Sequence, residues 1–223
     1  MRQIPLAIGV TPTRTFDSFV TGTNALVLAH LRGLAPDAAP VYLWGVTGAG
    51  KTHLLQALVH RIEDAGGRAG WFSAADPAPW PTTEPWSLVV LDDCERLDPD
   101  QQHSAFSLFV QAGARGVPVV GAGRLPPVDL PLREDLRTRL AWGHVFAVAP
   151  LAEADVRAAL RREADRRGIL LSDEVMDYLL RRFDRDMKHL TAQLDRLDEF
   201  SMSAKRMVTV PLLKQMLSEV VAR

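Results

Sequence analysis

The segment from Gly45 to Thr52, GVTGAGKT, constrains the fold more than any other part of the chain. It matches the pattern G-x-x-x-x-G-K-[ST] at every fixed position, and Gly45, Gly48 and Gly50 allow backbone N–H groups to approach a phosphate closely. Lys51 would add a positive charge for the β- and γ-phosphates, and the Thr52 hydroxyl would be a ligand for Mg²⁺. We therefore expect a P-loop that binds a nucleotide.

The residues on both sides of this segment support that interpretation over a glycine-rich turn without chemistry. A P-loop leaves a strand and enters a helix whose N-terminus faces the phosphates. Residues 41–44 (VYLW) form a short apolar run, and residues 53–60 (HLLQALVH) have helical spacing. Strand, loop and helix are thus predicted in the required order.

Further apolar runs predict strands at residues 69–73, 88–91, 117–120 and 144–148, separated by helices at about 24–34, 101–114 and 132–140. Strands that alternate with helices indicate a parallel, doubly wound α/β sheet. Residues 76–87 contain Pro77, Pro79, Pro81 and Pro85, so we expect a loop there.

Two acidic residues follow the apolar run 88–91 directly. This is the Walker B arrangement, in which Asp92 would hold Mg²⁺ through water and Asp93 would orient or deprotonate an attacking water. An acidic pair after an apolar run is common by itself, but it is a strong indication when it follows a complete P-loop.

Beyond Pro150 the pattern changes to helices alone. Periodic apolar residues predict four of them, with a stop at Gly168 and an N-cap at Ser172. We expect an N-terminal arm at 1–15, a nucleotide-binding α/β domain at 16–150 and an all-α lid domain at 151–223.

Composition excludes several classes of protein. A net charge of −1 and a pI near 6.6 argue against broad nonspecific DNA binding. The single cysteine, Cys94, excludes an intrachain disulfide and suits a reducing cytoplasm, and it fits a small core residue better than a nucleophile. No long apolar run suggests membrane insertion.

Several motifs resemble the DnaA group of AAA+ ATPases over essentially the whole chain. They are TFDSFV at 15–20, GKTHLL at 50–55 and LVVLDD at 88–93. Within this group, LRTRLAWG at 136–143 and FDRDMKHL at 183–190 are most similar to the Hda family, whose members inactivate DnaA.

This resemblance implies roles for three more residues. Arg139 takes the place of an arginine finger that acts on another molecule's nucleotide, and Arg185 that of the sensor-2 arginine on the chain's own nucleotide. Val20 would lie near the adenine. Without the motif, either arginine would be interpreted as a solvated charge on a helix face.

The N-terminal arm contains Gln3, Leu6 and Ile8 in a segment without sustained periodicity. By chemistry alone, a tail that folds back on the domain is favoured over a peptide ligand. The spacing also resembles the Q-x-x-[L/M]-x-[F/L] motif that binds the sliding clamp, and this resemblance favours the ligand.

One position departs from the family pattern. Gly123 occupies the sensor-1 turn, where a polar side chain would normally contact the γ-phosphate. Nucleotide binding is expected to survive this change, whereas hydrolysis by the chain itself is expected to be slow.

The resemblance implies an adaptor whose partners are DnaA and the β sliding clamp of DNA polymerase III. It would bind ADP or ATP with Mg²⁺, stimulate hydrolysis of DnaA-bound ATP and so prevent re-initiation of replication. Head-to-tail self-association is possible for this fold.

A DNA-binding initiator or helicase loader is the weaker alternative. Initiators of the group carry a helical insert after the second strand, where this sequence has the proline-rich loop, and we expect no further DNA-reading domain and no direct sequence-specific DNA binding. A free-standing ATPase is a third possibility.

Overall fold

The computed structural model describes residues 14–183 and 186–221. Within these residues, five strands form one sheet in the order β2-β3-β4-β1-β5, and all neighbouring strands run parallel. The strands are β1 (Val41–Trp44), β2 (Ala69–Ser73), β3 (Leu88–Asp92), β4 (Val119–Gly123) and β5 (His144–Ala147). The fold class predicted from the alternating pattern is thereby confirmed.

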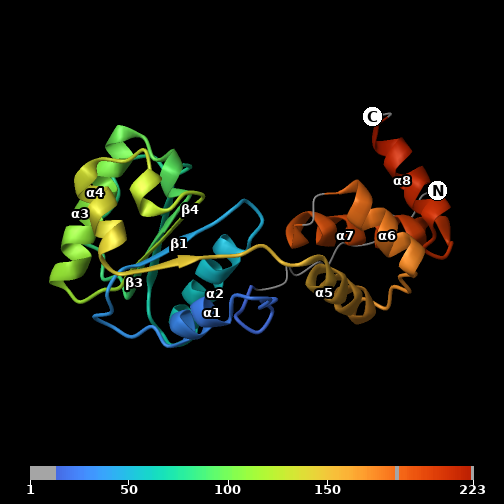
Figure 1. Ribbon diagram of the computed structural model, residues 1–223, viewed down its shortest axis with the longest axis horizontal. Helices are drawn as coiled ribbons and strands as arrows, with labels where there is room; N and C mark the ends of the chain where they lie inside the picture. Colours follow the sequence, from blue (N-terminus) through green and yellow to red (C-terminus); the bar gives the residue numbers. More distant parts are fainter. Residues whose placement is uncertain (1–13, 184–185, 222–223) are drawn as a thin grey trace.

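Helices cover both faces of the sheet (Figure 1). One face is covered by α1 (Ala25–Arg32) and α2 (Lys51–Asp64), and the other by α3 (Pro99–Ala114) and α4 (Glu134–Trp142). Short 3-10 turns, η1 (Cys94–Arg96) and η2 (Pro127–Asp129), follow β3 and β4. The sheet therefore separates the helix of the P-loop from α3 and α4.

Alternating side chains of the strands divide the core into two apolar layers. Leu43 and Val90 pack under α1 and α2, whereas Tyr42 and Leu91 pack under α3 and α4. Successive residues of a strand point to opposite faces, so each strand contributes to both layers. This explains why the strands contain nearly continuous apolar runs.

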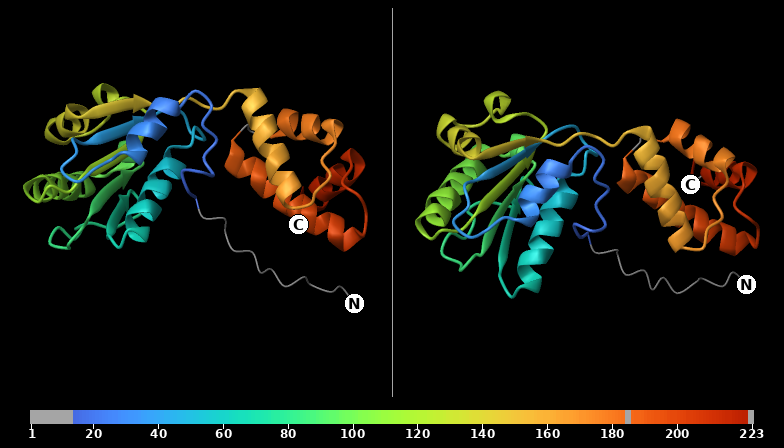
Figure 2. Two further views of the ribbon diagram at one scale, coloured as in Figure 1. Left: turned by 90° about the horizontal axis from the view of Figure 1, so that it is seen from below. Right: turned by 60° about the horizontal axis from the view of Figure 1, so that its bottom comes forward.

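The chain continues beyond β5 into an all-helical domain beside the sheet (Figures 1 and 2). Its helices are α5 (Glu153–Arg166), α6 (Asp173–Arg182), α7 (Met187–Ala204) and α8 (Val210–Val221). Ser172 caps α6 by accepting a hydrogen bond from the Val175 N–H, as its position predicts, and Gly168 adopts a positive φ after α5. This domain has an apolar core of its own.

Most predicted elements differ from the observed ones by one to three residues at their ends, and two of the shifts have a clear structural reason. The strand expected at 117–120 begins at Val119, because the N–H of Val117 bonds to Ala112 at the end of α3 instead, and it extends to Gly123. The helix expected at 132–140 runs from Glu134 to Trp142, since Leu132 is buried in the preceding loop. No helix of the described residues is long and apolar enough to cross a membrane.

Candidate functional site

The P-loop joins β1 to α2 at the carboxyl edge of the sheet. Gly48 and Gly50 have φ values of 83° and 100°, which side chains other than glycine rarely adopt. A Cβ at Gly50 would lie 2.8 Å from the Phe19 ring, and one at Gly48 would lie 2.7 Å from Cβ of Asp186. The loop is thus packed between the segment before α1 and the start of α7.

Lys51, the first residue of α2, is buried, with 8% of its surface exposed. Its ammonium donates hydrogen bonds to the carbonyls of Gly45 (2.7 Å) and Val46 (3.0 Å). Burial lowers the pKa of this amine, and the nearby carboxylates of Glu95 and Asp92 oppose that shift. The positively charged ammonium of Lys51 therefore lies within the loop that would surround the phosphates.

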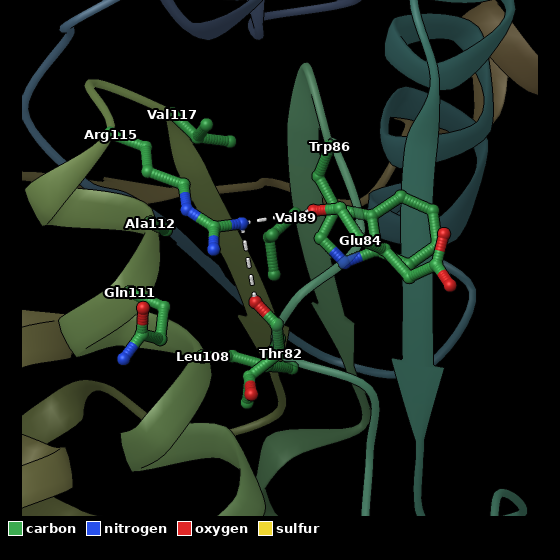
Figure 3. Close-up of a pocket in the computed structure, with 9 residues that line it drawn as sticks. All are labelled: Thr82, Glu84, Trp86, Val89, Leu108, Gln111, Ala112, Arg115 and Val117. Carbon is green, nitrogen blue, oxygen red and sulfur yellow. Dashed lines mark hydrogen bonds between the residues drawn. The ribbon is translucent and has the colours of Figure 1, made fainter.

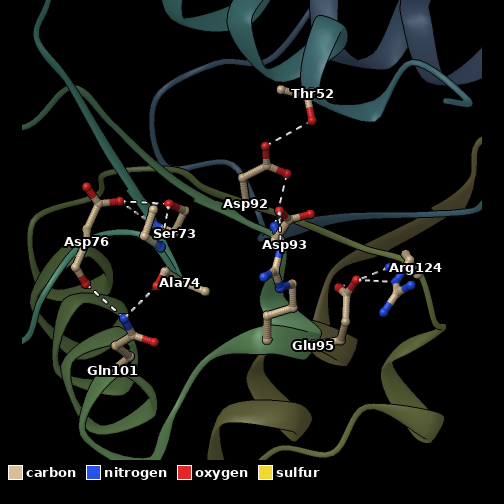
Figure 4. A network of polar contacts seen from close by, with 11 residues as sticks. Thr52, Ser73, Ala74, Asp76, Asp92, Asp93, Glu95, Gln101 and Arg124 are labelled. Atoms are coloured by element: carbon tan, nitrogen blue, oxygen red, sulfur yellow. Dashed lines mark hydrogen bonds and ion pairs between the residues drawn. The ribbon is translucent and has the colours of Figure 1, made fainter. Parts of the chain in front are cut away.

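Thr52 and Asp92 are brought together as the two motifs predict (Figure 4). The Thr52 hydroxyl donates to Oδ2 of Asp92 at 2.9 Å, and Asp92 lies at the buried end of β3. Burial raises the pKa of Asp92, while the Thr52 hydrogen bond opposes the shift. A hydroxyl beside a carboxylate is a set of hard oxygen donors that fits Mg²⁺.

The carboxylates of Asp92 and Asp93 lie in different surroundings because the backbone turns at Asp93. It has φ 53° and ψ 44°, a left-handed conformation that is uncommon outside glycine, and its N–H donates to Oδ1 of Asp92 at 3.0 Å. Its own carboxylate is about half exposed and lies 4.0 Å from Arg96. The buried residue of the pair thus faces Thr52, and the exposed one remains available to solvent.

Val20 is half-buried and follows Phe19, whose ring contacts Gly50 and meets His53 edge-on at 5.4 Å. Val20 thus directly follows a residue that packs on the P-loop, and the role near the adenine assigned to it stays a prediction. The predicted residues Gln3, Leu6, Ile8 and Arg185 lie outside the described residues.

Arg139 does not join the residues of the P-loop. It lies in the last turn of α4, on the opposite face of the sheet from α2, with its guanidinium 5.0 Å from the centre of the Phe106 ring of α3. Trp142, at the end of the same helix, is 78% exposed. The sheet itself therefore lies between Arg139 and the helix that carries Lys51.

Two charged residues near the site were given no role from sequence. Glu95, in η1, pairs with Arg124, which directly follows β4, and the Nε–Oε1 distance is 2.8 Å (Figure 4). The Glu95 side chain is only 5% exposed and its charge acts on Lys51. Neither residue belongs to a motif, and only the position of Arg124 beside the sensor-1 turn was a signal for it.

Cys94 is a core residue, as expected. It is fully buried between β3 and α3, and its thiol donates to the carbonyl of Leu91. Burial raises the pKa of the thiol well above its usual range. A neutral, buried thiol is a poor nucleophile.

A small pocket elsewhere does not contribute to this site (Figure 3). It lies between α3 and the loop before β3, where Arg115 donates to the carbonyls of Thr82 and Glu84. The Arg115 guanidinium is thus engaged with backbone, and the pocket contains none of the motif residues.

Comparisons with known families match both parts of the chain. The family model for the bacterial DnaA ATPase domain matches residues 10–69, and the model described as Hda, lid domain, matches residues 153–217. The second match covers the helices that follow the sheet.

Solved structures share the fold at low sequence identity. Domain III of the replication initiation protein DnaA from Thermotoga maritima has a TM-score of 0.78 and 18% identity, covering 95% of this chain and 98% of that chain. AMPPCP-bound DnaA from Aquifex aeolicus has a TM-score of 0.70 and 22% identity, covering 84% of this chain and 65% of that chain.

The RuvB Holliday junction branch migration motor of Thermotoga maritima is more distant, with a TM-score of 0.62 and 15% identity over 88% of this chain and 66% of that chain. These structural similarities establish the fold, and the two family models show which proteins with this fold the sequence resembles. The chain is a DnaA-like AAA+ protein close to Hda.

Proposed function

We propose that this chain is an adaptor that holds an adenine nucleotide of its own and supplies Arg139 to the nucleotide of DnaA. It would stimulate hydrolysis of DnaA-bound ATP and so prevent re-initiation of replication. The observation that carries this proposal is the position of Arg139 across the sheet from the P-loop helix, stacked on Phe106.

An arginine in that position is suited to a second molecule. Its planar guanidinium stays charged and can bridge two phosphate oxygens as charge develops in the transition state. Stacking on an aromatic ring restricts the side chain without using its hydrogen-bond donors. The exposed Trp142 beside it offers apolar surface to the same partner.

The chain's own site supports binding rather than a particular reaction. Lys51, Thr52 and Asp92 fit a nucleotide phosphate tail with Mg²⁺, which would neutralise phosphate charge when bound. Asp93 would orient water if hydrolysis occurs, and Val20 and Arg185 would contact the nucleotide. ADP and ATP share the diphosphate that these groups recognise.

The link to the β sliding clamp rests on the sequence pattern of Gln3, Leu6 and Ile8. An extended segment with spaced apolar residues suits a pocket on a partner. The segment 74–87 between β2 and β3 is described throughout and contains no helix, which favours an adaptor over a DNA-binding initiator.

Reconstitution tests the proposal. DnaA loaded with ATP is mixed with the clamp on DNA and with this protein, and phosphate release is followed over time. We expect rapid hydrolysis only when all three are present, and a variant lacking residues 2–8 should lose the clamp-dependent part. Hydrolysis that is unaffected by this protein would contradict the adaptor, and tight binding to DNA in gel shifts would favour an initiator.

A further inference from the structure

The end of β4 leaves no space for a side chain at position 123. A Cβ on Gly123 would lie 2.2 Å from the Tyr42 hydroxyl and 2.8 Å from Oε2 of Glu95. Both contacts are far shorter than real Cβ contacts, and Tyr42 is fully buried. A phosphate contact at this edge of the sheet therefore has to come from another residue.

Arg124 is the next residue along the chain, and a backbone hydrogen bond locates it beside the P-loop. The N–H of Gly45, the first residue of the loop, donates to the carbonyl of Gly123 at 3.3 Å. Arg124 thus directly follows a residue that is bonded to the P-loop, and its partner Glu95 also lies beside position 123.

Glu95 fixes Arg124 at two points. Its Oε2 accepts the backbone N–H of Arg124 at 3.1 Å and its Oε1 accepts Nε at 2.8 Å. Within the described residues these bonds do not use the terminal nitrogens of the guanidinium, which leaves both as donors. The side chain of Arg124 is 59% exposed, so an incoming ligand can reach it.

We propose that Arg124, positioned by Glu95, contacts the terminal phosphate of a nucleoside triphosphate in this chain's own site, in place of the side chain that Gly123 lacks. The inference rests on the proposed nucleotide binding. A charged, two-pronged donor suits a phosphate that carries several acceptor oxygens. Arg124 then distinguishes a triphosphate from a diphosphate.

The test compares the affinities of ADP and of a non-hydrolysable ATP analogue by calorimetric titration. Arg124→Ala should weaken binding of the analogue by about ten- to a hundredfold, the range expected for a charged hydrogen bond. It should change the affinity for ADP less than about twofold. Arg68→Ala is the control, because Arg68 is also an exposed arginine paired with a glutamate, Glu84, but it lies just before β2, at the amino edge of the sheet and away from the P-loop. It should change neither affinity.

Equal losses for both nucleotides, or no loss for either, would overturn the role of Arg124. Should Arg124→Ala fail to fold, Arg124→Lys carries the same test, since it keeps a positive charge beside Glu95 but not the fork. Arg124→Lys should weaken binding of the analogue alone, and by a smaller factor than Arg124→Ala. A wild-type protein that bound neither nucleotide would instead contradict the proposed function.

Discussion

Lys51 and Arg139 are both cations suited to phosphate, but their surroundings differ sharply. Lys51 is buried, bonded to two carbonyls of its own loop and surrounded by carboxylates. Arg139 lies at the end of a helix, on the other face of the sheet, against the ring of Phe106. A cation enclosed by its own chain fits a ligand held within the chain, whereas one at a helix end beside an exposed Trp142 fits a ligand brought by a partner.

The largest expected effect separates these two regions directly. Arg139→Ala should reduce the stimulation of ATP hydrolysis by DnaA about 10³-fold or more, the range known for arginine fingers supplied in trans. Phosphate release by ATP-loaded DnaA measures the effect. Arg137→Ala is the control, because Arg137 lies on the same helix, and it should keep near wild-type stimulation. If Arg137→Ala lost stimulation and Arg139→Ala did not, the finger would be Arg137.

The next effect concerns the enclosed cation. Lys51→Ala should weaken adenine nucleotide binding by about 100-fold, because it removes the only charge buried inside the loop among the described residues. Fluorescent nucleotide titration measures this change. Lys214→Ala, on α8 over the Tyr178 ring, should bind nucleotide as the wild type does. Unchanged affinity in Lys51→Ala would contradict nucleotide binding by the P-loop.

A smaller effect sharpens the description of the sensor-1 turn. Gly123→Ser should destabilise the protein by about 1–3 kcal/mol, as overpacking of a core does, because its Cβ meets the Tyr42 hydroxyl. Thermal unfolding of Gly123→Ser, of Tyr42→Phe and of the double variant forms a double-mutant cycle. Gly123→Ser should lower the free energy of unfolding less when Tyr42 is already phenylalanine. An equal loss of stability in both backgrounds would show that the Tyr42 hydroxyl is not the obstacle.

The smallest effect is a pH dependence of stability that arises at His53, where the segment before α1 contacts α2. Burial lowers the pKa of His53, which outweighs the hydrogen bond from its Nε2 to the Thr15 carbonyl. The unfolded state therefore takes up a proton first as the pH falls below about 6.5, so stability is complete above that pH and declines below it.

His53→Gln should make this decline shallower, because a glutamine amide can donate to Thr15 without titrating. It should not abolish the decline, since burial also lowers the pKa of His30. Melting temperatures at pH 7.5 and 5.5 measure the difference. An identical decline in both proteins would assign it to other groups.

Much of the site could be predicted because its motifs are local. The spacing from Gly45 to Thr52 and the acidic pair at the end of β3 determine which groups meet, and the structure joins Thr52 to Asp92 across 40 positions of sequence. Periodicity also identified every strand. It could not give the order of the strands, because the insertion of β4 between β1 and β3 depends on tertiary packing.

The residues that sequence missed act through contacts that no local pattern encodes. Phe106 and Glu95 look like ordinary residues of α3 and of a turn, and their relevance follows only from the neighbours that the fold supplies. Gly123 was recognised as a departure from the family pattern, but the reason that no side chain fits there, the Tyr42 hydroxyl from β1, required the structure.

The most direct test of the central claim measures two nucleotides in one sample. Arg139→Ala is loaded with a fluorescent ADP and mixed with DnaA that carries radiolabelled ATP, in the presence of the clamp on DNA. If Arg139 acts on the other molecule's nucleotide, the variant retains its ADP with wild-type affinity while hydrolysis by DnaA falls to the unstimulated rate. If the variant instead loses its own ADP, or still stimulates hydrolysis at the wild-type rate, Arg139 does not act in trans and the account is contradicted.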